Sequence, residues 1–333
     1  MSLETENRVP KQQTPSSTID FLESLSRRKE IFRGYSCVTE AVKRDNAQHL
    51  PPWLKKRMPI LREVHGVKTI LAEGALHTVC EEAMCPNLGE CFSQRTATFM
   101  ILGDICSRNC RFCAVRGGRP APVDEREPEN VARAAGKLGL RHVVVTSVSR
   151  DDLEDGGASH FVATIRALKA LPDSPTVEVL TPDFGGEEEA LRSVIEARPE
   201  VFNHNMETVE RLYPLVRPQA DYQRSLRLLK MVKQWGHGIY TKTGFMLGLG
   251  ERQDEVRGLL QDIVDVGCDI VTIGQYLRPS PHHLPVVCFY EPWEFKKIGR
   301  WAQDLGIRFV ASEPFVRSSY QARGALLTLA GRE

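Results

Sequence analysis

Six of the nine cysteines lie close together in the chain, in two groups of three. The first triplet, in CEEAMCPNLGEC, consists of Cys80, Cys85 and Cys91. The second triplet, in CSRNCRFC, consists of Cys106, Cys110 and Cys113 and directly follows an apolar run. Thiolates are soft ligands that suit zinc or an iron–sulfur cluster. The two triplets therefore predict metal chemistry.

Each triplet is one ligand short of four. A structural zinc site takes four protein ligands, whereas a catalytic centre leaves one position for its substrate. The missing ligands disfavour the alternative interpretation as a zinc knuckle or a disulfide cluster. The CxxxCxxC spacing of the second triplet, with Phe112 before its last cysteine, resembles that of radical S-adenosylmethionine enzymes. In that superfamily three cysteines hold a 4Fe–4S cube, and its fourth iron binds S-adenosylmethionine.

Composition excludes several classes of protein. The 44 Lys and Arg against 43 Asp and Glu give no basic footprint, so we expect no nucleic-acid partner. No apolar stretch is long enough to span a membrane. The first residues carry early glutamates and no apolar core, so they resemble neither a secretory signal nor a transit peptide. We therefore expect a cytoplasmic protein, in which clustered cysteines are more often metal ligands than disulfides.

The order of the predicted elements indicates the fold. From Ala97 on, β-rich runs are expected at 98–102, 142–147, 176–181, 201–205, 240–247 and 269–274. Helical stretches separate them at 129–138, 158–171, 187–197, 222–235 and 254–266. This alternation predicts a parallel α/β sheet with right-handed crossovers. Six units without a dinucleotide-type glycine loop favour a partial (β/α)6 barrel of the TIM type over a Rossmann sheet.

We divide the 333 residues into four parts. A polar tail and a helical extension occupy 1–50, and a loop-rich extension with the first triplet occupies 51–96. The barrel core occupies 97–300, and a C-terminal segment occupies 301–333. Each predicted strand of the core ends in a polar loop, and in a barrel such loops meet on the face where active sites form.

From Pro51 to about Ala322 the chain resembles the lipoyl synthase family. The resemblance rests on PPWLKKR, CEEAMCPNLGEC, TATFMILGDICSRNCRFCAV, TSVSRDDLEDGGA, VEVLTPDF, NHNMETV, TKTGFMLGLGE, TIGQYLRPS and RSSYQA. Members of this family are radical enzymes that add two sulfur atoms, at C6 and C8, to an octanoyl chain on a lysine of a carrier domain. The resemblance implies two 4Fe–4S clusters and two S-adenosylmethionine molecules per product, with the sulfur taken from an auxiliary cluster.

The same resemblance assigns the metal ligands and the catalytic residues. Cys106, Cys110 and Cys113 would hold the cluster that cleaves S-adenosylmethionine. Cys80, Cys85 and Cys91 would hold the auxiliary cluster, and the second serine of RSSY, Ser319, would be its fourth ligand. The family commonly reads RSSYH, whereas this chain has Gln321.

Further candidates for cofactor binding lie in the strands and in the loops after them. The loop containing Asp155, Gly156 and Gly157 is expected to receive the methionine amine, and Glu178 to reach the ribose. The residues expected to orient adenosyl or acyl groups are Asn203, Asn205, Lys242 and Arg278. Each of these side chains has an ordinary alternative role as a loop polar group or an ion-pair partner. We interpret the pair His282-His283 as loop packing, because a third metal ligand is missing.

The resemblance also implies partners. These are octanoylated lipoyl carrier domains, such as the E2 subunit of 2-oxoacid dehydrogenases and the H protein of glycine cleavage. A low-potential donor such as ferredoxin or flavodoxin would supply electrons. One alternative is another sulfur-inserting radical enzyme, such as an RNA methylthiolase or a biotin-synthase-like protein. A second is a non-catalytic iron–sulfur protein, which would leave the convergent polar loops without a use.

Overall fold

The computed structural model describes residues 50–55, 61–93, 97–320 and 322–331. All of them belong to one compact unit, Cys37–Glu333. The tail and helical extension predicted for residues 1–50 lie outside the described residues apart from Leu50, and Gln321 also lies outside them. Among the helices of the described ranges, none has the length and apolarity that a membrane span requires.

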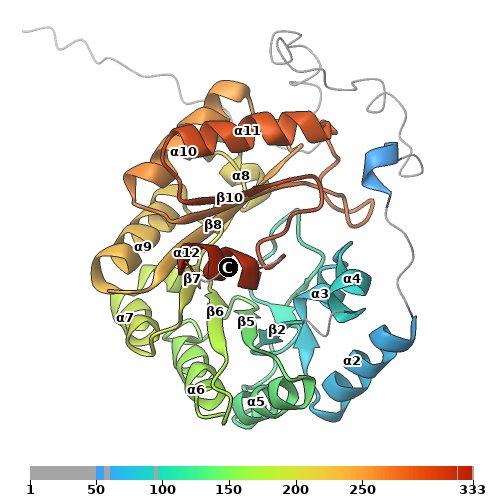
Figure 1. Cartoon of the computed structure of the whole chain (residues 1–333), viewed down its shortest axis with the longest axis vertical. Helices are drawn as coiled ribbons and strands as arrows, with labels where there is room; N and C mark the ends of the chain where they lie inside the picture. The colour runs from blue at the N-terminus through green and yellow to red at the C-terminus, as the bar shows by residue number, and fades with distance from the viewer. Residues whose placement is uncertain (1–49, 56–60, 94–96, 321, 332–333) are drawn as a thin grey trace, which may run out of the picture. The chain divides into compact units, whose positions relative to one another are not determined.

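An open sheet of eight strands, in the order β1-β2-β5-β6-β7-β8-β9-β10, is the centre of the fold (Figure 1). The predicted strands are confirmed as β2 (Thr98–Ile101), β5 (His142–Ser147), β6 (Thr176–Leu180), β7 (Val201–Asn203), β8 (Tyr240–Leu247) and β9 (Ile270–Gln275). These six strands pair in parallel. The predicted partial barrel is therefore confirmed.

Two edge strands were not predicted. At one edge β1 (His77–Thr78) runs antiparallel to β2, and at the other β10 (Phe309–Ser312) runs parallel to β9. A separate two-stranded sheet joins β3 (Ile105–Cys106) to β4 (Arg116–Gly117). Strand β10 lies beyond residue 300, where the predicted core ends, and yet it extends the sheet of the core. The four-part division of the chain stays a prediction.

Helices cover the outer side of the sheet (Figure 1). Those expected from the sequence are α5 (Glu127–Leu138), α6 (Ala158–Lys169), α7 (Glu188–Glu196), α9 (Tyr222–Trp235) and α10 (Gln253–Asp265), and α11 (Pro292–Asp304) adds another. The α7 helix illustrates their pattern, since it buries Ala190, Leu191, Val194 and Ile195 on one face. Short turns complete this part as η3 (Phe184–Gly186), η4 (Glu210–Leu212) and α8 (Tyr213–Val216).

The segment before the barrel is more helical than predicted. The expectation of a loop-rich extension is wrong, because this segment contains η2 (Pro52–Leu54), α2 (Leu61–Glu73), α3 (Val79–Glu82) and α4 (Leu88–Ser93). In α2 the side chains of Val64, Val67 and Leu71 are buried at helical spacing, and Gly66 and charged residues between them dilute the apolar signal.

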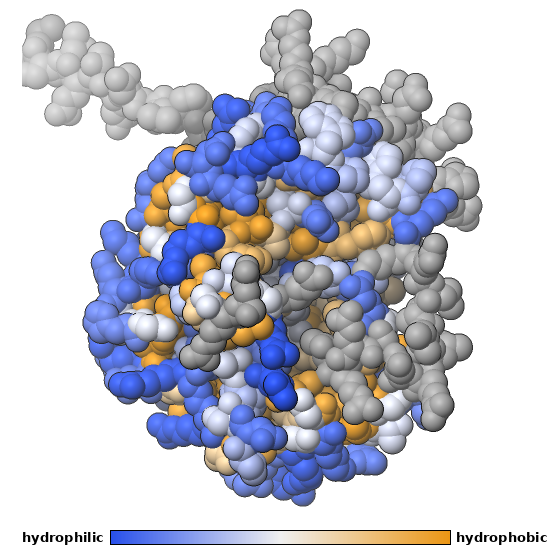
Figure 2. Space-filling model, viewed as in Figure 1, coloured by the Kyte–Doolittle hydropathy of each residue, from blue (hydrophilic) through white to orange (hydrophobic). Residues whose placement is uncertain are grey.

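The last helix, α12 (Ala322–Leu329), packs against the starts of the barrel strands. Its Ala325 and Leu326 share an apolar cluster with Val201 of β7 and Ile270 of β9. Tyr240 Oη at the start of β8 donates a hydrogen bond to Leu329 O at 3.3 Å. In the space-filling view, hydrophilic side chains cover the periphery and apolar ones gather nearer the middle (Figure 2).

The segment between β10 and α12 enters the other end of the barrel beside a glycine of β9. A Cβ atom at Gly274 would lie 2.1 Å from Val316 O and 3.1 Å from Arg317 Nη1. Because the nearest atom belongs to backbone, no side-chain rotation relieves the clash. The RSSY motif that begins at Arg317 therefore approaches the sheet only where β9 has no side chain.

We predict that Gly274→Ala displaces this segment and lowers the free energy of unfolding by about 1–3 kcal/mol, the usual cost of overpacking. Urea unfolding of the metal-free protein measures this change. Gly258, exposed in α10 with nothing within 4 Å of its added Cβ, is the matched control. Gly258→Ala should be neutral or stabilise by up to about 1 kcal/mol. Equal free energies of unfolding for Gly274→Ala and wild type would contradict this description of the segment.

Candidate functional site

The second cysteine triplet lies in the loop that follows β2, at the carboxyl end of the parallel strands. Cys106 ends β3, and its Sγ accepts hydrogen bonds from the backbone N–H groups of Arg108 at 3.4 Å and Ser149 at 3.3 Å. Ser107 N also donates to Ser149 O at 3.0 Å. N–H groups directed at a sulfur stabilise its anionic form, which is the form that binds iron.

An arginine inside the triplet anchors the loop to two other strand ends. The Arg108 guanidinium donates to both carboxylate oxygens of Asp151, which follows β5, at 2.7–3.1 Å. It also donates to Asp183 Oδ1, after β6, at 2.6 Å. Because the Arg108 and Asp183 side chains are 6% and 0% exposed, water competes little for this contact. We call these three side chains the Arg108 clamp.

The far side of the same loop is held by the segment around His283. His283 Nε2 lies 2.9 Å from Cys113 O, and His283 Nδ1 lies 2.9 Å from Ser280 Oγ. Since a carbonyl oxygen only accepts, Nε2 carries the proton and Nδ1 accepts from the serine. Arg278, predicted to orient the substrate, donates to His283 O at 2.9 Å and to Pro281 O. His283 therefore supports the triplet through a carbonyl.

The thiols of this triplet lie within electrostatic reach of one another. Burial, with smaller contributions from Cys110 and Cys106, raises the pKa of Cys113 to about 12. Burial likewise raises the pKa of Cys110, against the nearby charge of Arg217. Burial therefore favours the protonated thiols of Cys110 and Cys113, and a metal centre would supply the positive charge that removes their protons.

Within the described residues, no three Cys, His, Asp or Glu side chains converge on the position of a single ion. A tetrahedral zinc site would bring its thiolates to about 2.3 Å from one ion. In a 4Fe–4S cube each thiolate binds a different iron, which keeps the sulfurs further apart. Three thiols, with N–H groups directed at Cys106 Sγ, are a donor set that an iron–sulfur cluster takes.

The first triplet lies beside the edge of the sheet that β1 forms, with Cys80 in α3 and Cys91 in α4. Burial, followed by the influence of Cys85 and Cys91, raises the pKa of Cys80 to about 12. The three thiols are thus close enough to interact, like those of the second triplet. Cys80 is buried, and Cys85 and Cys91 are half-buried. Three such thiols within one short motif are a donor set that an iron–sulfur cluster takes.

Side-chain hydrogen bonds from two residues of the first triplet's motif join it to the C-terminal segment. Asn87 Nδ2 donates to Phe315 O at 2.7 Å, and Tyr320 Oη donates to Glu90 Oε1 at 2.6 Å. Burial, and then the bond to Glu90, raises the pKa of Tyr320 to about 12, with a smaller influence of Cys91. Arg317, at the other end of RSSY, is within electrostatic reach of Cys85. Ser319 lies between these two residues in the chain.

A buried carboxylate, Glu207, lies near the second triplet and Arg317. Glu207 interacts electrostatically with Cys110 and Cys113 and also with Arg317. Burial raises its pKa, although Arg217 opposes the shift. Its backbone has a φ of 64°, a left-handed conformation that is costly for a residue with a side chain. Glu207 and Arg317 therefore connect the surroundings of both triplets.

Sequence comparisons match this architecture. A model of the Radical SAM superfamily matches residues 100–263, and a model of the N-terminal domain of lipoyl synthase matches residues 2–85. The chain is 58% identical to a lipoyl synthase of Caldanaerobacter subterraneus over 272 residues, covering 82% of this chain and 95% of that protein. It is 51% identical to a lipoyl synthase of Methylococcus capsulatus over 318 residues, covering 95% and 96%.

The chain belongs to the lipoyl synthase family. It is a radical S-adenosylmethionine enzyme with lipoyl synthase activity, and S-adenosylmethionine and 4Fe–4S clusters are its cofactors. Among solved structures, Streptococcus suis SuiB bound to S-adenosylmethionine is similar with a TM-score of 0.50 and 10% identity, over 68% of this chain and 54% of that one. At this identity the similarity concerns the fold alone.

Two of the residues predicted to bind cofactor contact each other inside the barrel. Lys242 Nζ donates to Glu178 Oε1 at 2.7 Å, and both side chains are 1% exposed. Burial alone would raise the pKa of Glu178, but the Lys242 charge and His142 outweigh it and lower that pKa. Asn203 Nδ2 lies 3.5 Å from the same carboxylate. These contacts support the alternative role as ion-pair partners, and binding of ribose or adenosyl groups stays a prediction.

The predicted loop after β5 has a clear local role. Asp155 accepts hydrogen bonds from Gly157 N at 2.8 Å and Ser159 N at 2.7 Å, so its carboxylate caps α6. Gly157 has a φ of 91°, and a Cβ there would lie 2.4 Å from Leu102 Cδ1. Gly156 likewise has a positive φ, of 59°. Contact of this loop with the methionine amine stays a prediction.

Asn205 is the predicted candidate nearest to Glu207. Its Nδ2 donates to Glu207 Oε1 at 2.9 Å, whereas its buried Oδ1 has no hydrogen-bond partner among the described residues. A Cβ at Gly244 would lie 3.1 Å from that oxygen. An unpartnered buried amide oxygen beside a glycine is a place where a polar ligand group fits. Asn203 Oδ1 and Glu178 Oε2 are likewise buried without a hydrogen-bond partner among the described residues, so this signal is shared by three of the candidates.

Several residues of the site were not predicted from the sequence. Four of them lie inside motifs that were recognised, as Asn87 and Glu90 lie in CEEAMCPNLGEC, Arg108 in CSRNCRFC and Glu207 in NHNMETV. For the first three, a polar side chain between two cysteine ligands was the available signal. Arg217 had no such signal, and His283, interpreted as loop packing, contacts Cys113 O across 170 residues of sequence.

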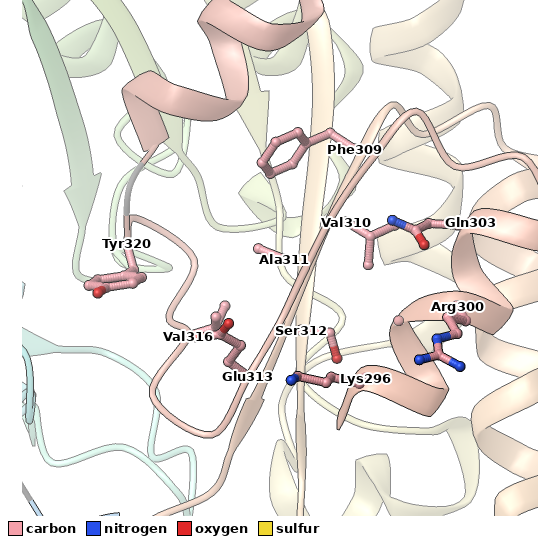
Figure 3. A pocket seen from close by; sticks show the side chains of 11 residues that line it. Lys296, Arg300, Gln303, Phe309, Val310, Ala311, Ser312, Glu313, Val316 and Tyr320 are labelled. Carbon is pink, nitrogen blue, oxygen red and sulfur yellow. The ribbon is translucent and has the colours of Figure 1, made fainter. Parts of the chain in front are cut away.

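A pocket of about 520 Å³ lies beside the C-terminal segment, between α11 and residues 309–320 (Figure 3). Tyr320 and Val316 line it from that segment, and Lys296 and Arg300 line it from α11. The segment therefore has the triplet loop as one neighbour and a pocket as another.

We predict that the Arg108 clamp weakens in acid. Arg108 lowers the Asp183 pKa from its ordinary 3.8 to about 2, although burial acts in the opposite direction. A lowered pKa means that the contribution is complete above about pH 4 and is lost as the pH falls toward 2. Asp183→Asn should therefore cost about 2 kcal/mol at pH 7 in the metal-free protein, and progressively less below pH 4.

Urea unfolding from pH 7 to pH 3 measures this difference. Asp152→Asn is the matched control, since Asp152 pairs with Arg150 outside the clamp and its side chain is 39% exposed. If the loss of unfolding free energy in Asp183→Asn does not change with pH, the stability of the Arg108 clamp does not depend on the Asp183 charge.

Proposed function

We propose that the second triplet, Cys106, Cys110 and Cys113, holds the cluster that cleaves S-adenosylmethionine. In the same proposal the first triplet, Cys80, Cys85 and Cys91, together with Ser319 holds an auxiliary cluster. The product is a lipoyl group, formed by adding sulfur at C6 and C8 of an octanoyl chain on a carrier lysine. When bound, the clusters and S-adenosylmethionine supply one-electron chemistry and sulfur, which these carbons require because they carry no acidic proton.

The observation that carries the proposal is the location of Ser319 between two residues that interact with the first triplet. Arg317 is within electrostatic reach of Cys85, and Tyr320 of Cys91. The hydrogen bonds from Asn87 and Tyr320 fix the same segment against the triplet loop. These contacts support Ser319, two residues after Arg317 and next to Tyr320, as the candidate for the position that a three-cysteine site leaves open.

The residues of the chain have distinct tasks in this proposal. Six thiols bind metal and lose their protons as they do so. The Arg108 clamp and His283 orient the loop that would hold the S-adenosylmethionine cluster. Ser319 offers a hard oxygen to a sulfide-rich iron, which is a poorer match than a fourth thiolate. That position is therefore the easiest one to vacate when sulfur leaves.

We also propose the partners of the reaction. The substrates are octanoylated carrier domains of the E2 subunit of 2-oxoacid dehydrogenases and the glycine cleavage H protein. The electron donor is a ferredoxin or a flavodoxin. We infer that the enzyme acts in the cytoplasm, where a reducing environment keeps six clustered thiols available for metal.

Replacing one cysteine of each triplet should stop the reaction at different steps. Cys110→Ala should abolish formation of 5′-deoxyadenosine, because no cluster remains to reduce the sulfonium. Cys85→Ala should retain cofactor cleavage and yield no sulfur-containing product. Anaerobic assay of 5′-deoxyadenosine, with mass spectrometry of an octanoylated carrier, distinguishes the two. Failure of both variants at the same step would contradict separate roles for the triplets.

Replacing the proposed serine ligand should affect sulfur transfer but not the cleavage of S-adenosylmethionine. Ser319→Ala should lower lipoyl formation at least tenfold while 5′-deoxyadenosine still forms. Ser319→Cys should give a complete auxiliary cluster that releases sulfur slowly, because thiolate binds iron more tightly. Iron analysis and product mass spectrometry follow both changes, with the adjacent Ser318→Ala as control. Wild-type turnover in both Ser319 variants would remove this residue from the mechanism.

A further inference from the structure

The C-terminal segment is fixed at two separate places. Close to β10, its backbone pairs with β9, since Glu313 N donates to Ile273 O at 3.2 Å and Gln275 N to Pro314 O at 3.1 Å. Beyond Pro314, the contacts pass to the first triplet loop through Asn87 and Glu90. These two side chains contact Phe315 and Tyr320, which lie on either side of residues 316–319.

Residues 316–319 form a turn whose other hydrogen bonds are local. Arg317 Nη1 donates to Val316 O at 2.7 Å, and Tyr320 N donates to Arg317 O at 3.0 Å. Neither bond attaches the turn to the triplet loop. A pocket lies beside Val316 and Tyr320 (Figure 3). Arg317 of the turn is within electrostatic reach of Cys85. The hydrogen bonds of Asn87 and Glu90 attach the segment to the triplet loop on both sides of this turn.

Both contacts are of a strong kind. Asn87 is 1% exposed, so little water competes for the hydrogen bond from its side-chain amide to Phe315 O. The Tyr320 hydroxyl donates to a carboxylate at 2.6 Å, and hydrogen bonds to charged groups are stronger than neutral ones. The two bonds span 228 and 230 residues of sequence.

We propose that Asn87 and Glu90 are positioning residues that keep Ser319 beside the first triplet. The inference rests on the proposed role of Ser319 as a ligand. Held at Phe315 and Tyr320, the turn stays in place when the serine oxygen leaves an iron. The oxygen then remains at a high effective concentration for rebinding. Removing either contact lets the turn drift away and exposes the fourth position to solvent.

The first test is amide hydrogen exchange of residues 313–320 in the metal-free protein. Asn87→Ala and Glu90→Ala should each accelerate exchange there about tenfold. Glu90→Gln keeps an acceptor oxygen for Tyr320 and should restore most of the protection. Glu82→Ala is the matched control, because Glu82 lies in the same loop and pairs with His77 instead. Unchanged exchange in both alanine variants would overturn the proposal.

The second test follows iron in the anaerobically reconstituted protein. A chelator should remove the auxiliary iron about tenfold faster from Glu90→Ala and Tyr320→Phe than from wild type. Iron held by the second triplet should be lost at the wild-type rate, which also shows that the barrel is folded. Equal loss from the auxiliary site in Glu90→Ala, Tyr320→Phe and wild type would overturn the proposal.

The ligand role of Ser319 and the positioning role of Asn87 and Glu90 can be disproved separately. If Ser319→Ala leaves iron release and sulfur transfer unchanged, the ligand role is wrong, and the proposal that depends on it falls with it. In that case altered exchange in Asn87→Ala would still identify a structural contact. If Ser319→Ala behaves as a ligand variant while Asn87→Ala and Glu90→Ala match wild type in hydrogen exchange, and Glu90→Ala and Tyr320→Phe match it in iron release, only the positioning role is wrong.

Discussion

Two hydrogen bonds between the first cysteine loop and the C-terminal segment are the constraint on which the proposed auxiliary site depends. Asn87 and Glu90 reach Phe315 and Tyr320 across most of the described chain. The contact joins segments next to the two opposite edge strands, β1 and β10. It also needs Gly274, where a side chain would collide with Val316 O. A local motif therefore becomes a site only after the whole barrel has formed.

The same logic applies to the second triplet. Its loop is oriented by Asp151 and Asp183, which follow two successive strands, and by His283 from a later loop. Parallel strands bring these ends to one edge of the sheet. Glu207 and Arg317 then connect the electrostatic surroundings of the two triplets. Burial and, to a smaller extent, the Glu207 charge raise the pKa of Cys110 and Cys113, whereas the Arg217 charge acts in the opposite direction on Cys110.

Local sequence pattern predicted the strands and helices of the core but not the contacts between them. The run HVVVTS is rich in β-branched residues, and the helix from Tyr222 to Trp235 buries its apolar residues at helical spacing; both form as expected. Strand β10 is four residues long and half-buried throughout, so no alternation marks it. Glu178 and Lys242 illustrate the limit for site residues. Their polar character suggested a ligand site, whereas the fold pairs them with each other across 64 residues.

The most direct test of the account is a crystal structure of the anaerobically reconstituted protein, with iron located by anomalous scattering. We expect two separate groups of iron. One should lie against Cys106, Cys110 and Cys113 with one iron free of protein ligands. The other should lie against Cys80, Cys85 and Cys91 with Ser319 Oγ on the remaining iron. A single group of iron, or an auxiliary group whose fourth ligand is not Ser319, would contradict the account.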